Sequence, residues 1–312
     1  MSAPPLDRWA LSRALTRLAN ASPAELAHRP LPEPAQHAAR RIGITGAPGA
    51  GKSTLVGHLA LERLPKGRLG VLAVDPSSPR SGGAILGDRV RMDDLAGSER
   101  LYIRSLGSRK TSDGLADNLP EMLDLMDQFG FDEVMLETVG VGQAEYAVRS
   151  QVDTLVLVLL PDSGDVVQAM KAGIMEMADI YVVNKADLPG AQRMVTDLRR
   201  IAAVTHRAPH AWAAPILLAS SSQPESIRTL SEAIDQHQEW LAATRQRQAQ
   251  RVQRARYRLR RLLELRIGEI VARQGDGLLE APLPQQLAHV LDAARAALAS
   301  EEASCQTALQ SP

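Results

Sequence analysis

The chain has 312 residues, a formal net charge of zero and an aromatic content of 3%. Balanced charge gives no electrostatic case for nucleic acid as the main partner, because phosphate backbones are bound by an excess of basic side chains. The one cysteine, Cys305, excludes an internal disulfide and a cysteine-cluster metal site. The longest apolar run, 155–160, is too short to span a bilayer, and charges interrupt the apolar stretches near the N-terminus, so we expect a cytoplasmic protein without membrane contact.

Residues 6–29 have apolar side chains at helical spacing, and a stretch with three prolines follows them. This pattern predicts an N-terminal helical extension over 1–39. From residue 40 onward, strand and helix patterns alternate, which is typical of an α/β fold with a mostly parallel central sheet and helices on both faces. The expected strands are 41–45, 69–75, 100–104, 132–137, 153–160, 178–183 and 215–219. The expected helices are 51–63, 114–129, 166–175, 190–203 and 225–245.

Arginine dominates from Arg245 to Arg273, interleaved with leucine and isoleucine at helical spacing. Such a helix could bind nucleic acid, but the near absence of aromatic side chains for base stacking favours an amphipathic arm that packs on a partner protomer. A last helix is expected over about 284–299. The predicted organisation is therefore a core domain over 40–245, a C-terminal helical dimerisation arm over 246–300 and a polar tail over 301–312.

A glycine-rich segment follows the first expected strand and opens the first core helix at Thr54. It matches the phosphate-loop pattern G-x-x-x-x-G-K-[ST] in the strand-then-helix setting that the pattern requires, and it reads Gly46-Ala47-Pro48-Gly49-Ala50-Gly51-Lys52-Ser53. In such a loop, backbone N–H groups and the helix N-terminus face phosphate oxygens. Lys52 is expected at the β- and γ-phosphates and the Ser53 hydroxyl at Mg²⁺. The segment predicts a P-loop NTPase.

Two other expected strands end in a carboxylate. Asp75 ends 69–75, and Glu137 ends 132–137, before Thr138-Val139-Gly140-Val141-Gly142-Gln143. In a parallel sheet these strand ends lie at the same edge as the phosphate loop. We therefore expect Asp75 and Glu137 near the metal, with the glycine-rich stretch after Glu137 sensing the γ-phosphate and positioning water.

The tetrad Asn184-Lys185-Ala186-Asp187 follows the strand expected at 178–183. Asp187 can accept two hydrogen bonds from the N–H groups of guanine, whereas adenine offers no such pair of donors. Asn184 is expected to brace the loop and Lys185 to lie along the base plane. The loop that supports the base reads Leu218-Ala219-Ser220-Ser221, close to a Ser-Ala clamp but shifted, so Ala219 and Ser220 are expected at the base. These features predict GTP as the nucleotide.

Four stretches together resemble the MeaB/ArgK/MMAA family, in the metallochaperone group of P-loop GTPases. They are 43–54, Ala73-Val74-Asp75-Pro76-Ser77-Ser78 with Gly82-Gly83-Ala84-Ile85-Leu86-Gly87-Asp88-Arg89, Glu137–Gln143 and Val183–Asp187. The resemblance covers about residues 40–245. It implies a GTPase that acts as a chaperone of an adenosylcobalamin-dependent acyl-CoA mutase such as methylmalonyl-CoA mutase: it gates cofactor loading and protects the mutase, with GTP hydrolysis as the timer.

The resemblance also implies site roles and partners. Ser53, Asp75, Asp88 and Glu137 would form the Mg²⁺ and switch set, and Lys52, Glu137 and Asp88 would be the catalytic residues. The switches would be 76–94, 138–146 and a third from Leu160 to Lys171 that faces the mutase. A low intrinsic GTPase rate and a homodimer are implied, and we expect no cobalamin bound by this chain itself.

Two tracts depart from the family's pattern, 106–114 and the third switch, and both lie where a client would dock. The client could therefore be methylmalonyl-CoA mutase or a mutase for isobutyryl, hydroxyisobutyryl or ethylmalonyl groups. Two other functions stay open. A nickel-insertion GTPase would need clustered metal ligands, whereas the histidines here are scattered. The ATPase or kinase of an amino-acid (LAO/AO) transport system would not need the guanine-type tetrad. A non-catalytic structural dimer is disfavoured by the intact Lys52, Ser53 and Glu137.

Overall fold

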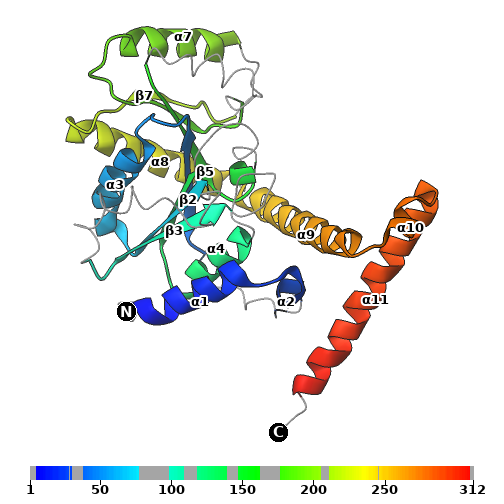
Figure 1. Cartoon of the computed structure of the whole chain (residues 1–312). Coiled ribbons are helices and arrows are strands. Elements are labelled where there is room, and N and C mark those ends of the chain that lie inside the picture. The colour runs from blue at the N-terminus through cyan, green and yellow to red at the C-terminus, as the bar shows by residue number, and fades with distance from the viewer. Residues whose placement is uncertain are drawn as a thin grey trace.

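The computed structural model describes residues 5–27, 29, 38–76, 98–108, 118–138, 147–161, 176–204, 211–244 and 246–309. Its centre is a seven-stranded sheet in the order β3-β2-β4-β1-β5-β6-β7, in which every neighbouring pair runs parallel (Figure 1). The expected α/β architecture of a P-loop NTPase, with a parallel sheet between helices, is confirmed.

All seven expected strands are present, with boundaries that differ by a few residues. They are β1 (Arg40–Gly46), β2 (Leu69–Pro76), β3 (Leu101–Ser108), β4 (Glu133–Thr138), β5 (Thr154–Leu159), β6 (Ile180–Val183) and β7 (Ile216–Leu218). The largest difference is in β3, which continues four residues beyond its expected end at 104, because its backbone pairs with β2 over the full length from Leu69↔Leu101 to Pro76↔Ser108.

The helices follow the expected order. They are α1 (Arg8–Asn20), α2 (Pro23–Ala27), α3 (Lys52–Arg63), the 3₁₀ turn η1 (Leu64–Lys66), α4 (Leu119–Gln128), α7 (Ala191–Val204), α8 (Pro224–Ala243), α9 (Gln246–Ala272), α10 (Asp276–Leu279) and α11 (Leu283–Leu309). The helical pattern over 6–29 is divided between α1 and α2, because Pro23 starts a new helix. The helix expected over 166–175 lies outside the described residues.

The last helix is longer than expected. The end at about 299 was wrong, because α11 continues to Leu309 and includes most of the stretch expected as a polar tail. Residues 300–309 contain no glycine or proline, and five of the ten are alanine, glutamate or glutamine. Such residues favour a helix even where no apolar stripe marks it.

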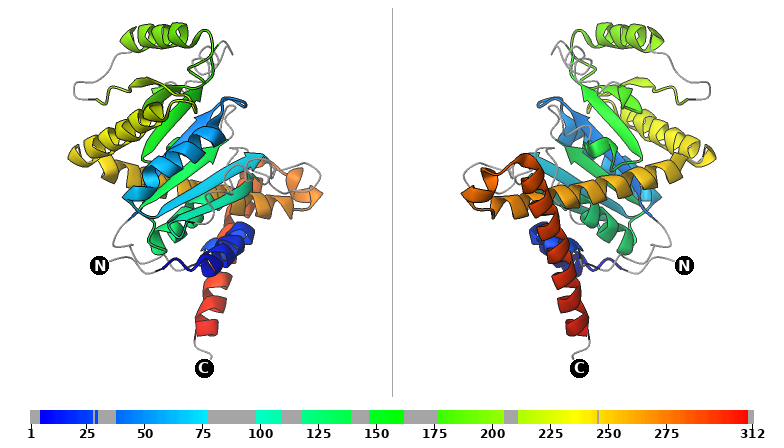
Figure 2. Two further views of the ribbon diagram at one scale, coloured as in Figure 1. Left: turned by 90° about the vertical axis from the view of Figure 1, so that its left-hand side faces the viewer. Right: turned by 90° about the vertical axis from the view of Figure 1, so that its right-hand side faces the viewer.

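Alternate residues of the strands face two helical layers, as the two-residue period of a strand requires. On one face, α1 and α4 pack on β2, β4 and β5 through a cluster that includes Leu15, Leu123 and Leu136, and α7 packs beside them. On the other face, α3 and α8 pack through a cluster that includes Leu59 and Ile234. Figure 2 shows the sheet between these layers. The expected N-terminal extension thus supplies part of the core through α1.

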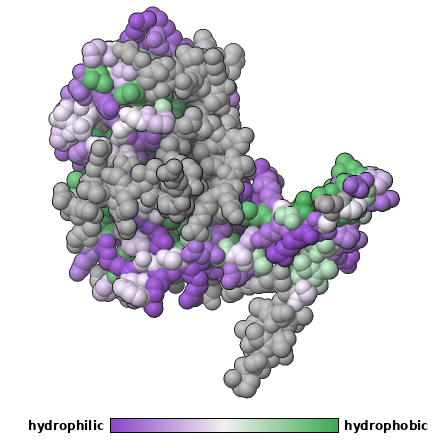
Figure 3. All heavy atoms as spheres, viewed as in Figure 1, coloured by the Kyte–Doolittle hydropathy of each residue, from purple (hydrophilic) through white to green (hydrophobic). Residues whose placement is uncertain are grey.

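The C-terminal helices form an arm. α9 is held to the core by ion pairs of Arg254 with Asp153 at 2.6 Å and of Arg258 with Glu121 at 2.7 Å. Beyond this anchor, α10 and α11 project away from the core (Figures 1 and 2). Exposed apolar side chains line the arm (Figure 3), namely Leu259, Leu263, Val271, Leu279, Leu283, Leu287, Leu291 and Leu298. Among the described helices, none is both long and apolar enough to cross a membrane.

Candidate functional site

The candidate site lies at the carboxyl ends of four strands. β1 ends in Gly46 at the start of the phosphate loop, and β4 ends in Thr138, directly after Glu137. β6 is followed by Asn184, and β7 by the loop that contains Ser220. Because all these strands run parallel, their carboxyl ends meet at one edge of the sheet, the usual position of ligands in open α/β folds.

The phosphate loop requires glycine at two points. A Cβ at Gly46, where φ is +145°, would overlap the carbonyl oxygen of Val158 on the neighbouring strand. Gly51 is the left-handed N-cap of α3, with φ of 81°. A Cβ there would lie 2.6 Å from the side-chain nitrogen of Asn184. The backbone therefore turns tightly into α3, whose first N–H groups have no partner within the helix and carry the positive end of its dipole.

Lys52 is the first residue of α3, and its ammonium group lies over the loop. Its Nζ donates hydrogen bonds to the carbonyl oxygens of Gly46 at 2.8 Å and Ala47 at 2.9 Å. The side chain is only 6% exposed. The ammonium is thus held over the concave side of the loop by backbone oxygens, where an anion can replace one of these contacts.

Ser53 and Glu137 meet at the start of α3. The Ser53 hydroxyl donates a hydrogen bond of 2.7 Å to Glu137 Oε1, and Glu137 is 7% exposed. Two hard oxygen groups side by side at the start of α3 would suit Mg²⁺, which prefers oxygen donors and few protein contacts. Asp75 lies at the same edge, because its neighbour Val74 pairs with Thr138. Its side chain, and Asp88 entirely, lie outside the described residues.

The tetrad Asn184–Asp187 contacts the phosphate loop directly. Asn184 donates a hydrogen bond of 2.8 Å from Nδ2 to the Ala50 carbonyl oxygen. Lys185, which has a positive φ of 53°, donates from Nζ to the Gly49 carbonyl oxygen at 3.3 Å. These two contacts fix the distance between the phosphate loop and the tetrad, that is, between the part of the site that would hold phosphate and the part that would hold a base.

Asp187 is supported from the neighbouring strand end. The Ala186 N–H donates to the Ala219 carbonyl oxygen at 3.0 Å. The Ser220 hydroxyl donates to Asp187 Oδ1 at 2.7 Å, and this hydrogen bond lowers the pKa of Asp187 below its ordinary value. The carboxylate is therefore ionised at neutral pH and can only accept hydrogen bonds. The supporting loop contains a further side chain that the motifs did not predict, Ser222, whose only signal in the sequence is the run of serines after β7.

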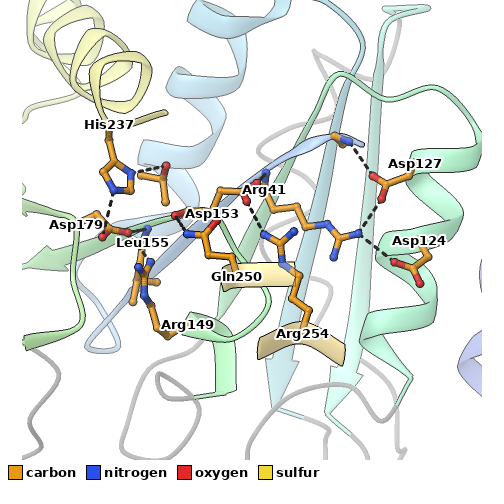
Figure 4. Close-up of polar contacts among 12 residues, drawn as sticks. Arg41, Asp124, Asp127, Arg149, Asp153, Leu155, Asp179, His237, Gln250 and Arg254 are labelled. Atoms are coloured by element: carbon orange, nitrogen blue, oxygen red, sulfur yellow. Dashed lines mark hydrogen bonds and ion pairs between the residues drawn. The ribbon is translucent and has the colours of Figure 1, made fainter. Parts of the chain in front are cut away.

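A second polar cluster lies at the opposite edge, at the amino ends of the strands (Figure 4). Asp179, just before β6, accepts hydrogen bonds from Arg149 Nη1 at 2.5 Å and from the Leu155 N–H at 2.7 Å. His237 of α8 lies 3.4 Å from Asp179 and 2.9 Å from the Thr154 hydroxyl. The arm joins this edge through Asp153. The cluster is far from the strand ends that form the candidate nucleotide site, so it supports the attachment of α8 and α9.

The two titratable groups of this cluster respond to acid in opposite directions. Burial, together with the positive charge of Arg149, lowers the pKa of His237 to about 4, and the negative charge of Asp153 opposes only part of this shift. Between about pH 6.5 and pH 4, His237 is therefore protonated in the unfolded chain but not in the folded chain, so acid favours unfolding. Burial also raises the pKa of Asp179 to about 6, against the opposing charge of Arg149. The folded chain then binds a proton at Asp179 before the unfolded chain does, so acid favours folding.

Single variants should uncover these opposing effects. On acidification from pH 6.5 to 4, we expect His237→Gln to gain unfolding free energy relative to the wild type, and Asp179→Asn to lose it, each by roughly 3 kcal/mol. In the wild type the two changes largely cancel. Urea unfolding at several pH values measures the slopes. Parallel pH profiles for the two variants would contradict the assignment, whereas a constant offset from the lost Arg149 contact would not.

Comparison with known proteins identifies what the chain is similar to. A family model described as "Methylmalonyl Co-A mutase-associated GTPase MeaB" matches residues 11–275. A "probable GTPase" of Mycobacterium tuberculosis is 38% identical over 255 residues, which cover 78% of this chain and 75% of the relative. The mitochondrial methylmalonic aciduria type A homolog of Mus musculus is 37% identical over 215 residues, 68% of this chain and 52% of the relative.

A solved structure is similar over nearly the whole chain. The crystal structure of a LAO/AO transport system kinase has a TM-score of 0.64 and 24% sequence identity, and the match covers 97% of this chain and 100% of that one. At this level of identity the likeness supports the fold alone.

Proposed function

Because the chain belongs to the MeaB family of methylmalonyl-CoA mutase-associated GTPases, we propose that it binds and slowly hydrolyses GTP in order to gate the loading of adenosylcobalamin into an acyl-CoA mutase and to protect that enzyme. One observation carries the GTP part of the proposal: Asn184 bonds to Ala50, so the guanine-type tetrad and the phosphate loop form one continuous surface. A nucleotide bound across this surface would contact the phosphate loop with its phosphates and the tetrad with its base.

The proposed chemistry is electrostatic. Lys52 and the N–H groups at the start of α3 bind the phosphates and stabilise the charge that develops on the transferred group. Ser53 and Glu137 hold Mg²⁺, together with Asp75 and Asp88, whose side chains the structure does not describe. The metal, when bound, neutralises phosphate charge. Glu137 is also proposed to position the attacking water. Slow basal turnover follows if the partner has to order the remaining groups.

The proposed partner is a cobalamin-dependent mutase, methylmalonyl-CoA mutase or a related acyl-CoA mutase. The support is the description of the family itself. The switches expected at 76–94, 138–146 and 160–171 lie largely outside the described residues, so the surface that would face the client rests on the resemblance. The cytoplasmic location likewise stays a prediction.

Cofactor loading tests the chaperone role. Purified apo-mutase is mixed with adenosylcobalamin, with and without this protein, and the rate of holoenzyme formation is followed by absorbance in the presence of GTP, GDP or a non-hydrolysable GTP analogue. We expect the loading rate to depend on which nucleotide is bound. Loading that is the same in all three nucleotide states would contradict the role, even if GTP binding were intact.

We further propose that the arm closes a homodimer. The apolar stripe of α11 is unusually exposed, with Leu287 at 55% and Leu291 at 62%, and burying such a stripe against a second copy is favourable. Sedimentation equilibrium should give twice the mass of the chain, and Leu287→Lys should lower the dimer affinity by at least about tenfold. Leu61→Lys, at an exposed leucine of α3 away from the arm, is the matched control. A monomeric wild type would contradict the proposal.

A further inference from the structure

Ser222 lies two residues after the serine that contacts Asp187. Its hydroxyl oxygen is 2.8 Å from Ser220 Oγ, and its backbone N–H also points to that oxygen at 3.4 Å. Ser220 Oγ is in turn 2.7 Å from Asp187 Oδ1. The three side chains therefore form a chain of hydrogen bonds that ends on the carboxylate expected to bind guanine.

The direction of this chain follows from the number of protons. An ionised Asp187 only accepts hydrogen bonds, so the single hydroxyl hydrogen of Ser220 must point to Asp187. Ser220 Oγ can then only accept from Ser222, and the Ser222 hydroxyl must be the donor. Each donor in such a chain polarises the next, which strengthens the final bond to the carboxylate.

The backbone of this loop is fixed independently. The Ser220 N–H donates to Ser226 Oγ at 3.1 Å, and the Ser226 hydroxyl donates to the Gln223 carbonyl oxygen at 2.6 Å. Ser226 lies in the first turn of α8, which packs on α3 behind the phosphate loop. The loop backbone is therefore held by contacts that do not involve the Ser222 hydroxyl, and this hydroxyl is directed to Ser220.

We propose that Ser222 is a positioning residue for guanine recognition, acting through Ser220 on the orientation of the Asp187 carboxylate. The inference rests on the proposed binding of guanine by Asp187. Guanine presents two donors to the carboxylate, N1–H and the 2-amino group, so both oxygens have to lie in the plane of the base. Hypoxanthine lacks the 2-amino group and depends less on this orientation.

The test compares the affinities of Ser222→Ala for GDP and inosine diphosphate by isothermal titration calorimetry. We expect the variant to bind GDP about fivefold more weakly, the effect of losing one hydrogen bond in a charged chain, and to prefer GDP over inosine diphosphate less than the wild type does. Ser222→Thr keeps the hydroxyl and should restore both values. Thr229→Ala removes a hydroxyl of α8 that bonds only to the Glu225 carbonyl oxygen, and should change neither.

The outcomes separate this inference from the function on which it rests. An unchanged GDP affinity in Ser222→Ala overturns the role of Ser222. An equal loss of affinity for both diphosphates overturns it as well, because that result indicates a structural role without specificity. A wild type with no preference for GDP over ADP would instead overturn the proposed binding of guanine, and with it the proposed function.

Discussion

Replacing Lys52 by alanine should lower the affinity for GTP and GDP by at least about 100-fold, because the variant loses a buried charge that is aimed at the phosphates. In the structure the ammonium is held over the loop by the carbonyl oxygens of Gly46 and Ala47. Gly46 is buried and Ala47 half-buried, so the variant leaves two backbone carbonyl oxygens without this donor, and the fold should lose about 2 kcal/mol of unfolding free energy.

Lys66→Ala is the matched control for Lys52→Ala. Lys66 lies in η1 at the far end of α3 and bonds to the Ser231 hydroxyl at 3.0 Å. Its loss changes the net charge equally but should leave nucleotide affinity unchanged. Fluorescent GDP titration and thermal unfolding are measured on both variants. If Lys52→Ala binds GDP as tightly as the wild type, the phosphate loop has been assigned wrongly.

Replacing Asp187 by asparagine should change which base is bound. The asparagine amide keeps one acceptor but places an N–H₂ where guanine has its own donor group, whereas xanthine carries an oxygen there. We expect GTP affinity to fall by at least about 100-fold and xanthosine triphosphate to become the preferred ligand, because a site built for a particular donor pair leaves polar groups unpaired with the wrong base.

Asp197→Asn makes the same chemical change at an exposed position of α7, where Asp197 forms a weak surface contact with Arg200 at 3.5 Å. It should leave the ratio of GTP to xanthosine triphosphate affinity as it is in the wild type. Competition titrations against a labelled nucleotide give this ratio for both variants. If Asp187→Asn keeps the wild-type ratio, the tetrad does not recognise guanine.

The meeting of the strand ends at one edge of the sheet could be predicted because its signals are local. A glycine loop after a buried strand, a carboxylate at Glu137 and the tetrad at Asn184 each follow a strand end, and a parallel sheet brings such ends together. The supporting loop differs from the usual order of serine and alanine, and the sequence predicts Ala219 and Ser220 at the base. In the structure the Ser220 hydroxyl lies in hydrogen-bond contact with Asp187.

Contacts between distant segments could not be predicted from local patterns. The chain from Ser222 to Asp187 joins two strand ends, and the ion pair of Arg149 with Asp179 joins segments thirty residues apart in the sequence. The attachment of α9 by Arg254 was hidden because its helix contains many arginines, and only packing decides which of them faces the core. Charge content indicates an exposed helix, while the structure distinguishes the anchoring arginines from the others.

The rate of GTP hydrolysis tests the proposal that this GTPase serves a cobalamin-dependent acyl-CoA mutase. Phosphate release by the pure protein is measured alone and with an acyl-CoA mutase from the same source, with Lys52→Ala as the blank. We expect a slow, Mg²⁺-dependent basal rate that rises several-fold with the mutase. A rate that no such mutase changes, but that rises with the apoprotein of a nickel enzyme, would contradict it and leave only the GTPase assignment standing.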